Sequence, residues 1–365
     1  MNSKTFIGLA AVTAIAVVLA VVAIGSRPSF ESSDVAGERL FPGLVNDLNR
    51  LKTVTLRHKD GTYSIDRTAN GWVLRERDNY PVDAEKVDEL VVKIARMTRL
   101  EAKTRLPDRY ERLDLQEPDA KDSRAKEVTL TDGEGKTIAQ LVVGKRKFTL
   151  GSKEGGTYVR IPGDEQTWLA VGELNPGDKV RDWLKRDIAD IKDKDIRRVT
   201  VVHPDGERIE VGKDNPDDAN FKILNLPKGQ EPTSEFVADD FGRVLSIFLL
   251  DDVKQDGAMP WPADKAIKAE FEGFAGFKVS LDYVEADGQN WVKISATPPP
   301  AETPPADGAP AEGAPSEGAV DWAKIIAEIN ARAEGWVFQV PAYEVNALKK
   351  RMAELARKPE SEDGT

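Results

Sequence analysis

The chain has 365 residues, 63 of them acidic and 52 basic, and a formal net charge of −11; it contains two histidines and no cysteine. The absence of cysteine excludes disulfides, thiolate nucleophiles, cysteine-ligated zinc and a lipidated N-terminal cysteine. The acidic balance, without a long basic run, argues against a nucleic-acid partner, because phosphate binding needs clustered Lys and Arg.

The segment Thr5–Gly25 carries no charged residue. A helix of that length would measure roughly 30 Å, about the thickness of the hydrocarbon core of a bilayer. We therefore predict that residues 1–26 form a cytoplasmic N-terminus and a transmembrane anchor. A cleaved signal peptide is the alternative, with Lys4 as its basic start and Ala23-Ile24-Gly25 as its cleavage site. Both interpretations place the rest of the chain across the membrane, and the length of the apolar run favours the anchor.

Residues 27–39 are polar and predict a stalk, and residues 40–118 predict a first α+β repeat. Apolar and polar residues alternate over 52–57, and Asp60-Gly61 and Asn70-Gly71 are hairpin turn signals, which together predict a three-strand meander. A helix should follow Asp83, because four apolar residues recur there with helical spacing: Val87, Leu90, Val91 and Ile94.

Residues 119–195 predict a β-rich middle module. Strands are expected at 128–130, 137–143, 157–161 and 168–171, with a turn at Asp132-Gly133. A short bridging helix is expected near the end of the module, from the spacing of Val180, Trp183, Leu184 and Ile188.

Residues 196–260 predict a second α+β repeat. Val199–Gly206 aligns with Val54–Gly61, including the His and the Asp-Gly turn. An internal duplication explains this match. The apolar spacing also recurs after Pro232, at Phe241, Val244, Leu245 and Phe248, and predicts the helix of the repeat.

Residues 261–357 predict a third, looser α+β repeat with a Pro/Ala-rich insertion at 298–319. That composition cannot bury apolar surface, so we expect the insertion to remain solvated. Helical spacing resumes at Trp322, a strand is expected at 335–340, and a helix at 342–357. Residues 358–365 form a polar tail. The predicted fold class is α+β: an N-terminal transmembrane helix followed by tandem repeats of an antiparallel β-meander plus a helix.

No catalytic, cofactor-binding or metal-binding residue is predicted. His58 and His203 occupy the same position two residues before an Asp-Gly turn, which favours a structural role for both. Gly135-Lys136-Thr137 lacks the first glycine and the helix of a phosphate-binding loop. Two acidic clusters lack the spacing of a calcium loop and are interpreted as solvated faces: Asp187, Asp190, Asp193 and Asp195, and Asp214, Asp217 and Asp218. We therefore expect no cofactor.

The chain resembles an uncharacterised bacterial family of single-pass envelope proteins at four places: Leu40–Leu44, Trp72, Tyr80-Pro81 and Pro107–Leu113. Its members carry tandem α+β domains of unknown function and are often encoded beside gliding-motility-type ABC transporters. The resemblance extends over most of residues 40–355, while the Pro298–Ala319 insertion departs from it. It implies a single-pass protein of the bacterial inner membrane, with a cytoplasmic N-terminus and a periplasmic bulk.

The first functional hypothesis is a periplasmic accessory or interaction protein, auxiliary to an ABC-type export system. Its expected partners are the inner membrane and the permease and ATPase subunits of that transporter. An enzyme or binding protein acting on envelope glycans or lipids is the alternative, and its carboxylate pair would be hidden among the many acids. A passive spacer that binds the cell wall is a third possibility.

Overall fold

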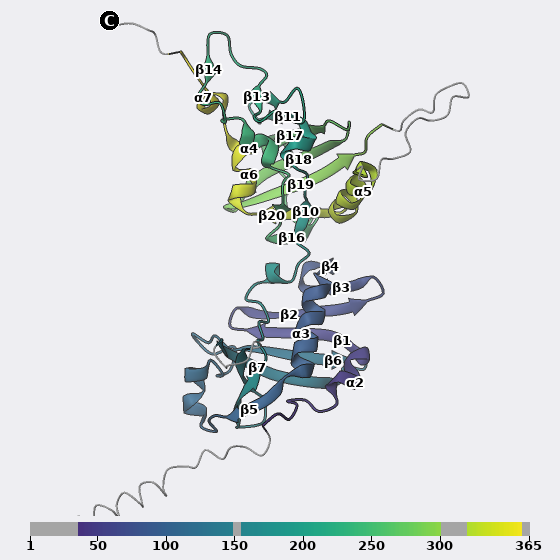
Figure 1. The fold of residues 1–365 in the computed structure, drawn as a ribbon, viewed down its shortest axis with the longest axis vertical. Helices are drawn as coiled ribbons and strands as arrows, with labels where there is room; N and C mark the ends of the chain where they lie inside the picture. The colour runs from purple at the N-terminus through teal and green to yellow at the C-terminus, as the bar shows by residue number, and fades with distance from the viewer. Residues whose placement is uncertain (1–35, 149–154, 301–319, 360–365) are drawn as a thin grey trace, which may run out of the picture. The chain divides into compact units, whose positions relative to one another are not determined.

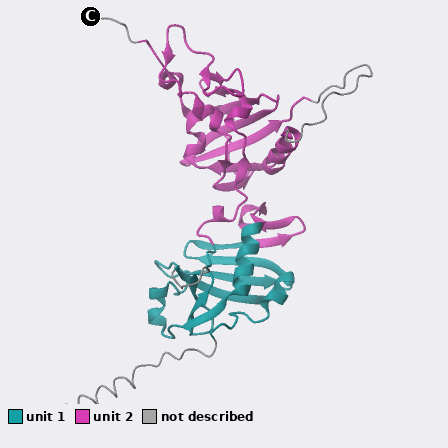
Figure 2. Cartoon of the chain, in the orientation of Figure 1, with its two compact units in different colours: residues 1–64, 85–176 teal, residues 65–84, 177–365 magenta. Residues whose placement is uncertain are grey.

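The computed structural model describes residues 36–148, 155–300 and 320–359. Its fold is α+β, with mostly antiparallel β-sheet and few helices (Figure 1). Two compact units divide the chain (Figure 2). Unit 1 is the described part of residues 1–64 and 85–176, and unit 2 is the described part of 65–84 and 177–365.

The larger sheet has nine strands in antiparallel meanders, as the turn signals predict. Its hairpin turns include Ala69-Asn70, between β2 and β3 and one residue before the predicted position, and 133–136, between β6 and β7. In order across the sheet, the strands are β4 (Tyr80–Pro81), β3 (Gly71–Leu74), β2 (Gly61–Thr68), β1 (Leu51–His58), β6 (Lys126–Asp132), β7 (Thr137–Lys147), β8 (Gly156–Arg160), β9 (Thr167–Val171) and β5 (Thr98–Ala102).

Unit 2 contains an eight-stranded sheet and two short strand pairs. The sheet runs in the order β13 (Lys222–Ile223), β12 (Arg208–Gly212), β11 (Ile196–Val202), β17 (Ile267–Gly273), β18 (Lys278–Ala286), β19 (Gln289–Thr297), β20 (Trp336–Val340) and β16 (Asp252–Gln255). The short pairs are β10 (Asp187–Ala189) with β15 (Phe248–Leu249), and β14 (Glu231–Pro232) with β21 (Ala356–Arg357).

The α-helices in the described part of the chain are α2 (Leu44–Asp47), α3 (Ala84–Arg96), α4 (Asp239–Arg243), α5 (Trp322–Ala333), α6 (Ala342–Lys349) and α7 (Met352–Leu355). The predicted apolar face of α3 is buried, including Val87 and Ile94. No helix within 36–148, 155–300 and 320–359 is long and apolar enough to cross a membrane. The span predicted at Thr5–Gly25 lies outside the described residues and stays a prediction.

The bridging helix predicted over Val180–Ile188 is wrong. A single 3-10 turn covers Val180–Asp182, and Asp187–Ala189 form strand β10, which pairs with β15. Trp183, Leu184 and Ile188 are nevertheless buried. The apolar spacing therefore indicated burial correctly, but the strand pairing with a distant segment decided the conformation.

Two further helices are shorter than their patterns predict. Helix α4 ends at Arg243, although Val244, Leu245 and Phe248 beyond it are all buried. The predicted C-terminal helix divides into α6 and α7, and Arg351, which lies between them, pairs with Asp205 and Glu207.

Aromatic packing and one amide organise the core of unit 2. Tyr80 in β4 contacts the rings of Trp336 and Phe338 in β20 edge-on, with centroids 5.0 and 6.3 Å apart. Asn330 attaches α5 to β19 by accepting a hydrogen bond from the N–H of Ala296 (2.8 Å) and donating one to its carbonyl (2.7 Å). Strand β19 and helix α5, which flank residues 301–319, therefore pack together.

Candidate functional site

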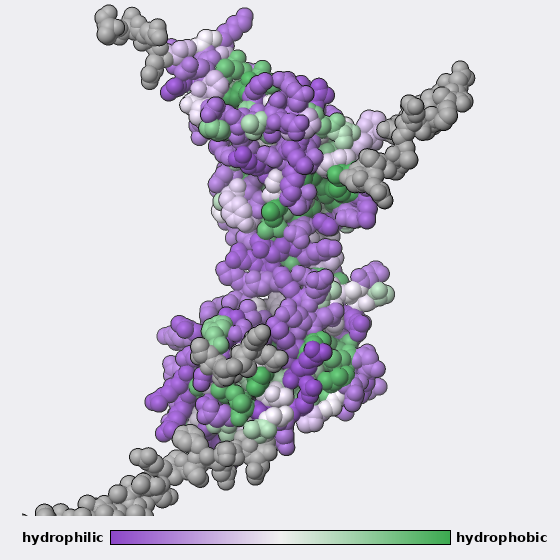
Figure 3. Space-filling view, viewed as in Figure 1, coloured by the Kyte–Doolittle hydropathy of each residue, from purple (hydrophilic) through white to green (hydrophobic). Residues whose placement is uncertain are grey.

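A groove in unit 2 lies between α6 and the segment that runs from α4 to β15. We call it the Glu344 groove; its volume is about 580 Å³. Apolar and charged side chains both line it, among them Asp240, Arg243, Ile247, Tyr343, Glu344 and Lys350. On the face drawn in Figure 3, hydrophilic residues dominate and hydrophobic residues form small separate patches.

Ile247 has a strained backbone at the edge of this groove. Its φ is +56°, a left-handed conformation that is a genuine outlier for a β-branched residue. Its side chain is 57% exposed, whereas Leu245 and Phe248 on either side are fully buried. Burial of these two neighbours leaves the intervening turn little freedom and leaves Ile247 facing solvent. Backbone strain of this kind persists only where the surroundings enforce it, and it concentrates at functional sites.

Hydrogen bonds to the segment 186–191 enforce the same turn. The side chain of Asp190 accepts the N–H of Ile247 (3.2 Å), and Ser246 Oγ donates to the carbonyl of Ile191 (3.0 Å). Arg186 Nε donates to the carbonyl of Leu250 (2.8 Å). The strained residue is thus held from both sides along the chain.

Helix α6 supplies the opposite wall. Val345 and Leu348 are fully buried and orient the helix, while Tyr343 is 65% exposed. Glu344 lies in the first turn and is only 8% exposed. Its Oε1 accepts a hydrogen bond from the N–H of Leu249 (3.2 Å), which joins the two walls.

Burial raises the pKa of Glu344 to about 7, and the nearby carboxylate of Asp251 adds to this shift. The Leu249 N–H and the Arg186 guanidinium oppose it by favouring the charged form. Burial is the largest of these effects, and Arg186 is also hydrogen-bonded to Asp251 and to the carbonyl of Leu250. Glu344 therefore changes charge near neutral pH, as a group suited to proton-linked binding or acid–base chemistry does.

The other charges around the groove are paired. Lys350 Nζ lies 2.7 Å from Asp240 Oδ2. Arg243 lies 3.7 Å from Asp193 and 3.8 Å from Asp239. Glu344 has no ion-pair partner within 4 Å among the described residues. Among the described charged residues that line this groove, it is therefore the one without an ion pair.

Replacing Glu344 with glutamine is expected to remove part of the pH dependence of folding. An unfolded glutamate ionises near pH 4.5, whereas folded Glu344 retains its proton until about pH 7. The unfolded state therefore becomes relatively more favourable as pH rises through this window, by about 3 kcal/mol. Urea titrations at pH 5 and pH 8 should show this loss in the wild type and a smaller one in Glu344→Gln. The matched control is Glu328→Gln, at an exposed position, which should lose as much stability between pH 5 and pH 8 as the wild type does. A loss in Glu344→Gln as large as that of the wild type would contradict the raised pKa of Glu344.

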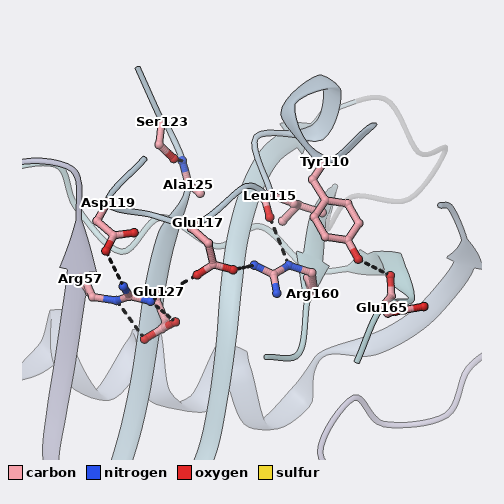
Figure 4. Close-up of polar contacts among 10 residues, drawn as sticks. All are labelled: Arg57, Tyr110, Leu115, Glu117, Asp119, Ser123, Ala125, Glu127, Arg160 and Glu165. Carbon is pink, nitrogen blue, oxygen red and sulfur yellow. Dashed lines mark hydrogen bonds and ion pairs between the residues drawn. The ribbon is translucent and has the colours of Figure 1, made fainter. Parts of the chain in front are cut away.

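A charged network in unit 1 is the other notable cluster of polar side chains (Figure 4). Arg160 in β8 is 7% exposed and donates to the carbonyl of Leu115 (3.1 Å) and to Glu117 (2.8 Å). Arg57 lies 2.9 Å from Glu127 and 3.3 Å from Asp119. Arg160 joins strand β8 to the segment 114–125, and Arg57 joins strand β1 to that segment and to the neighbouring strand β6. This network therefore positions the segment 114–125 on the sheet.

The two histidines lie at hairpin ends, as predicted. The N–H of Asp60 donates to His58 Nδ1 (3.1 Å), within the β1–β2 turn. His203 is 2% exposed, and its Nε2 lies 3.1 Å from the carbonyl of Lys350. Burial, together with the nearby Arg351 guanidinium, lowers the pKa of His203. The two side chains make different contacts, and neither lines the Glu344 groove.

Three members of the acidic clusters noted in the sequence have local partners. Asp190 pairs with Lys192 (2.8 Å) and Asp214 with Lys222 (2.9 Å), while Asp218 accepts the N–H groups of Asp214 and Asn215 (3.0 Å each). Within the described ranges, no group of three or more His, Asp or Glu side chains is arranged to hold a metal ion.

Sequence reasoning missed Glu344 and Ile247. One signal was available for Glu344, since it precedes Leu348 by four residues and so falls on the apolar face of the predicted helix. No sequence signal marked Ile247, because its conformation depends on pairing with residues 187–191.

Comparison with known proteins adds one match. Residues 72–245 match the model of a domain of unknown function, DUF4340. This match is compatible with an uncharacterised family and carries no activity with it. No curated protein matches the chain, and no solved structure matches it.

Proposed function

We propose that this protein is a membrane-anchored accessory protein of the bacterial envelope that binds a protein partner and serves as an auxiliary component of an ABC-type export system. The uncharged segment Thr5–Gly25 supports the anchor. The resemblance of residues 40–355 to envelope proteins encoded beside such transporters supports the partner. In this proposal the N-terminus is cytoplasmic and both folded units are periplasmic.

The observation that best supports an interaction function is the exposed side chain of Ile247. A β-branched residue in the left-handed region costs roughly 1–2 kcal/mol, and here the exposed side chain gains little burial in return. Tyr343, also exposed, lines the same groove. An aromatic residue beside an exposed aliphatic one is the composition of a protein-binding patch rather than of a solvated surface.

The test uses a variant that separates binding from folding. Ile247→Asn keeps a residue that tolerates the left-handed conformation, so the fold should be retained or gain about 1 kcal/mol. We expect full-length wild type, purified in mild detergent, to recover the permease and ATPase subunits of an ABC transporter. Ile247→Asn should recover roughly tenfold less, as loss of an interface anchor does.

The matched control is Phe236→Ser, which removes a 58% exposed aromatic residue of the same unit away from the Glu344 groove. It should leave recovery unchanged. Absence of any transporter subunit from the wild-type eluate, with ATPase activity unaffected by deletion of the chain, would refute the transporter link.

Hydrolysis of envelope glycans is the second candidate function, and the raised pKa of Glu344 favours it. A carboxylic acid that titrates near 7 is suited to protonate a leaving group. A glycosidase needs a second, available carboxylate, commonly about 5–10 Å from the first. Asp240, which also lines the groove, is held by Lys350 at 2.7 Å. Because Asp240 is paired, it is not available as the second carboxylate, and hydrolysis is therefore less well supported than the interaction function.

A further inference from the structure

We infer that the Glu344 groove binds a peptide segment of the partner protein whose lysine or arginine side chain reaches Glu344 while neighbouring apolar residues cover Ile247 and Tyr343. This inference rests on the proposed interaction function and specifies the chemistry of the partner at that site.

Charge complementarity selects a cation. Asp240 and Lys350 neutralise each other, and Arg243 lies between Asp193 and Asp239. Glu344 alone faces the groove without an ion-pair partner among the described residues. An arriving ammonium or guanidinium group would form a charge-assisted hydrogen bond with a carboxylate that is already largely desolvated, so little further desolvation of Glu344 opposes the contact.

An anion fits this groove less well. It would meet the carboxylates of Glu344 and Asp240, and the cations that line the groove already have acidic partners. A neutral apolar ligand would cover Ile247 and Tyr343 but would bury Glu344 further without compensation, which costs free energy whenever that group is charged.

The apolar part of the groove selects a peptide rather than a free amine. Val244, Leu249 and Ala347 line it along with the exposed Ile247 and Tyr343. A volume of about 580 Å³ accommodates several side chains. A basic residue with apolar neighbours satisfies both the charge and this surface.

The arrangement also links binding to pH. The charged groups around Glu344 are Arg186 and Asp251 behind it, Asp240 and Arg243 from α4, and Lys350 after α6. Burial raises the pKa of Glu344 to about 7, and a bound cation would lower it again. If only the ionised form binds, the ionised fraction of Glu344 rises from about one tenth at pH 6 to about nine tenths at pH 8, which strengthens binding about tenfold.

The experiment measures binding of a labelled peptide, acetyl-Ala-Leu-Lys-Leu-Ala-amide, to the full-length chain in detergent by fluorescence anisotropy. We expect binding that is about tenfold tighter at pH 8 than at pH 6. The same peptide with acetyl-lysine, which has no charge, should bind at least tenfold more weakly at pH 8. Equal binding of the two peptides would overturn the inference.

Variants locate the contact. Glu344→Gln should bind the lysine peptide weakly and without pH dependence, whereas Phe236→Ser should bind it as the wild type does. A thermal unfolding transition at pH 8 confirms that the glutamine variant is folded. Unchanged, pH-dependent binding by Glu344→Gln would place the peptide elsewhere and reject the proposal.

The two proposals fail in different ways. If transporter subunits co-purify in an Ile247-dependent manner but Glu344→Gln recovers them equally, the accessory function stands and the cation site is wrong. If the lysine peptide binds through Glu344 but no transporter subunit is recovered, the cation site stands and the ABC partner is wrong.

Discussion

Replacement of Arg160 by alanine is expected to lower the free energy of unfolding by about 3 kcal/mol. The buried guanidinium is the partner of the carbonyl of Leu115, a fully buried residue, and it lies over the ring of Tyr110 at 5.1 Å (Figure 4). The alanine variant leaves that carbonyl unsatisfied, at a cost of roughly 1–3 kcal/mol, and also loses packing against the ring.

The ion pair with Glu117 contributes little to this figure. The side chain of Glu117 is 61% exposed, so water solvates it once Arg160 is gone. The larger loss comes from the carbonyl and the packing. We therefore expect damage that is local to the segment 110–125, which Arg160 attaches to the sheet.

Urea denaturation measures the total loss, and hydrogen exchange of residues 110–125 locates it. Lys145→Ala is the matched control, since Lys145 donates to the carbonyl of Arg112 (2.9 Å) in the same region but its side chain is 46% exposed. It should cost less than about 0.5 kcal/mol. An Arg160→Ala chain as stable as the wild type would contradict the structural role of this network.

Gly242→Ala should destabilise unit 2 by about 3 kcal/mol, although alanine favours helix by about 1 kcal/mol over glycine. A Cβ at this position in α4 would lie 2.2 Å from two ring carbons of Phe221. That ring is 3% exposed, and Lys213 Nζ lies 4.7 Å from its centroid. Asp239 also accepts the N–H of Phe221 (2.8 Å), so the ring has little room to withdraw. The steric cost therefore outweighs the helix propensity.

A compensating change checks the cause. In Gly242→Ala/Phe221→Leu the smaller side chain should restore part of the stability lost in the single variant, as measured by thermal unfolding. Gly133→Ala, where a Cβ would meet nothing within 4 Å, is the control and should stay within about 0.5 kcal/mol of the wild type. Because α4 also lines the Glu344 groove, the single variant should bind the lysine peptide more weakly. A double variant no more stable than Gly242→Ala would exclude the ring contact as the cause.

Local patterns predicted the meanders and the long helices well. The turn near Asn70-Gly71 and the apolar spacing of α3 and α5 depend on residues close together in the chain, and the structure confirms them. The same spacing failed at Val180–Ile188 and beyond Arg243. There the apolar residues are buried as expected, but β10 and β15 pair across roughly 60 residues of chain, and that pairing replaces the helix.

The sequence by itself determined several of the turns, the burial of many apolar side chains, that no familiar catalytic motif is present, and that Thr5–Gly25 has the composition of an anchor. These properties follow from local composition and spacing. Only the tertiary structure decided the candidate site. Glu344 acquires its raised pKa from burial in the groove between α6 and the segment from α4 to β15, which lies about 95 residues earlier in the chain, and Ile247 acquires its exposure and strain from contacts with residues 187–191. Desolvation and backbone strain depend on what packs against a residue, and a pattern read along one segment does not contain that information.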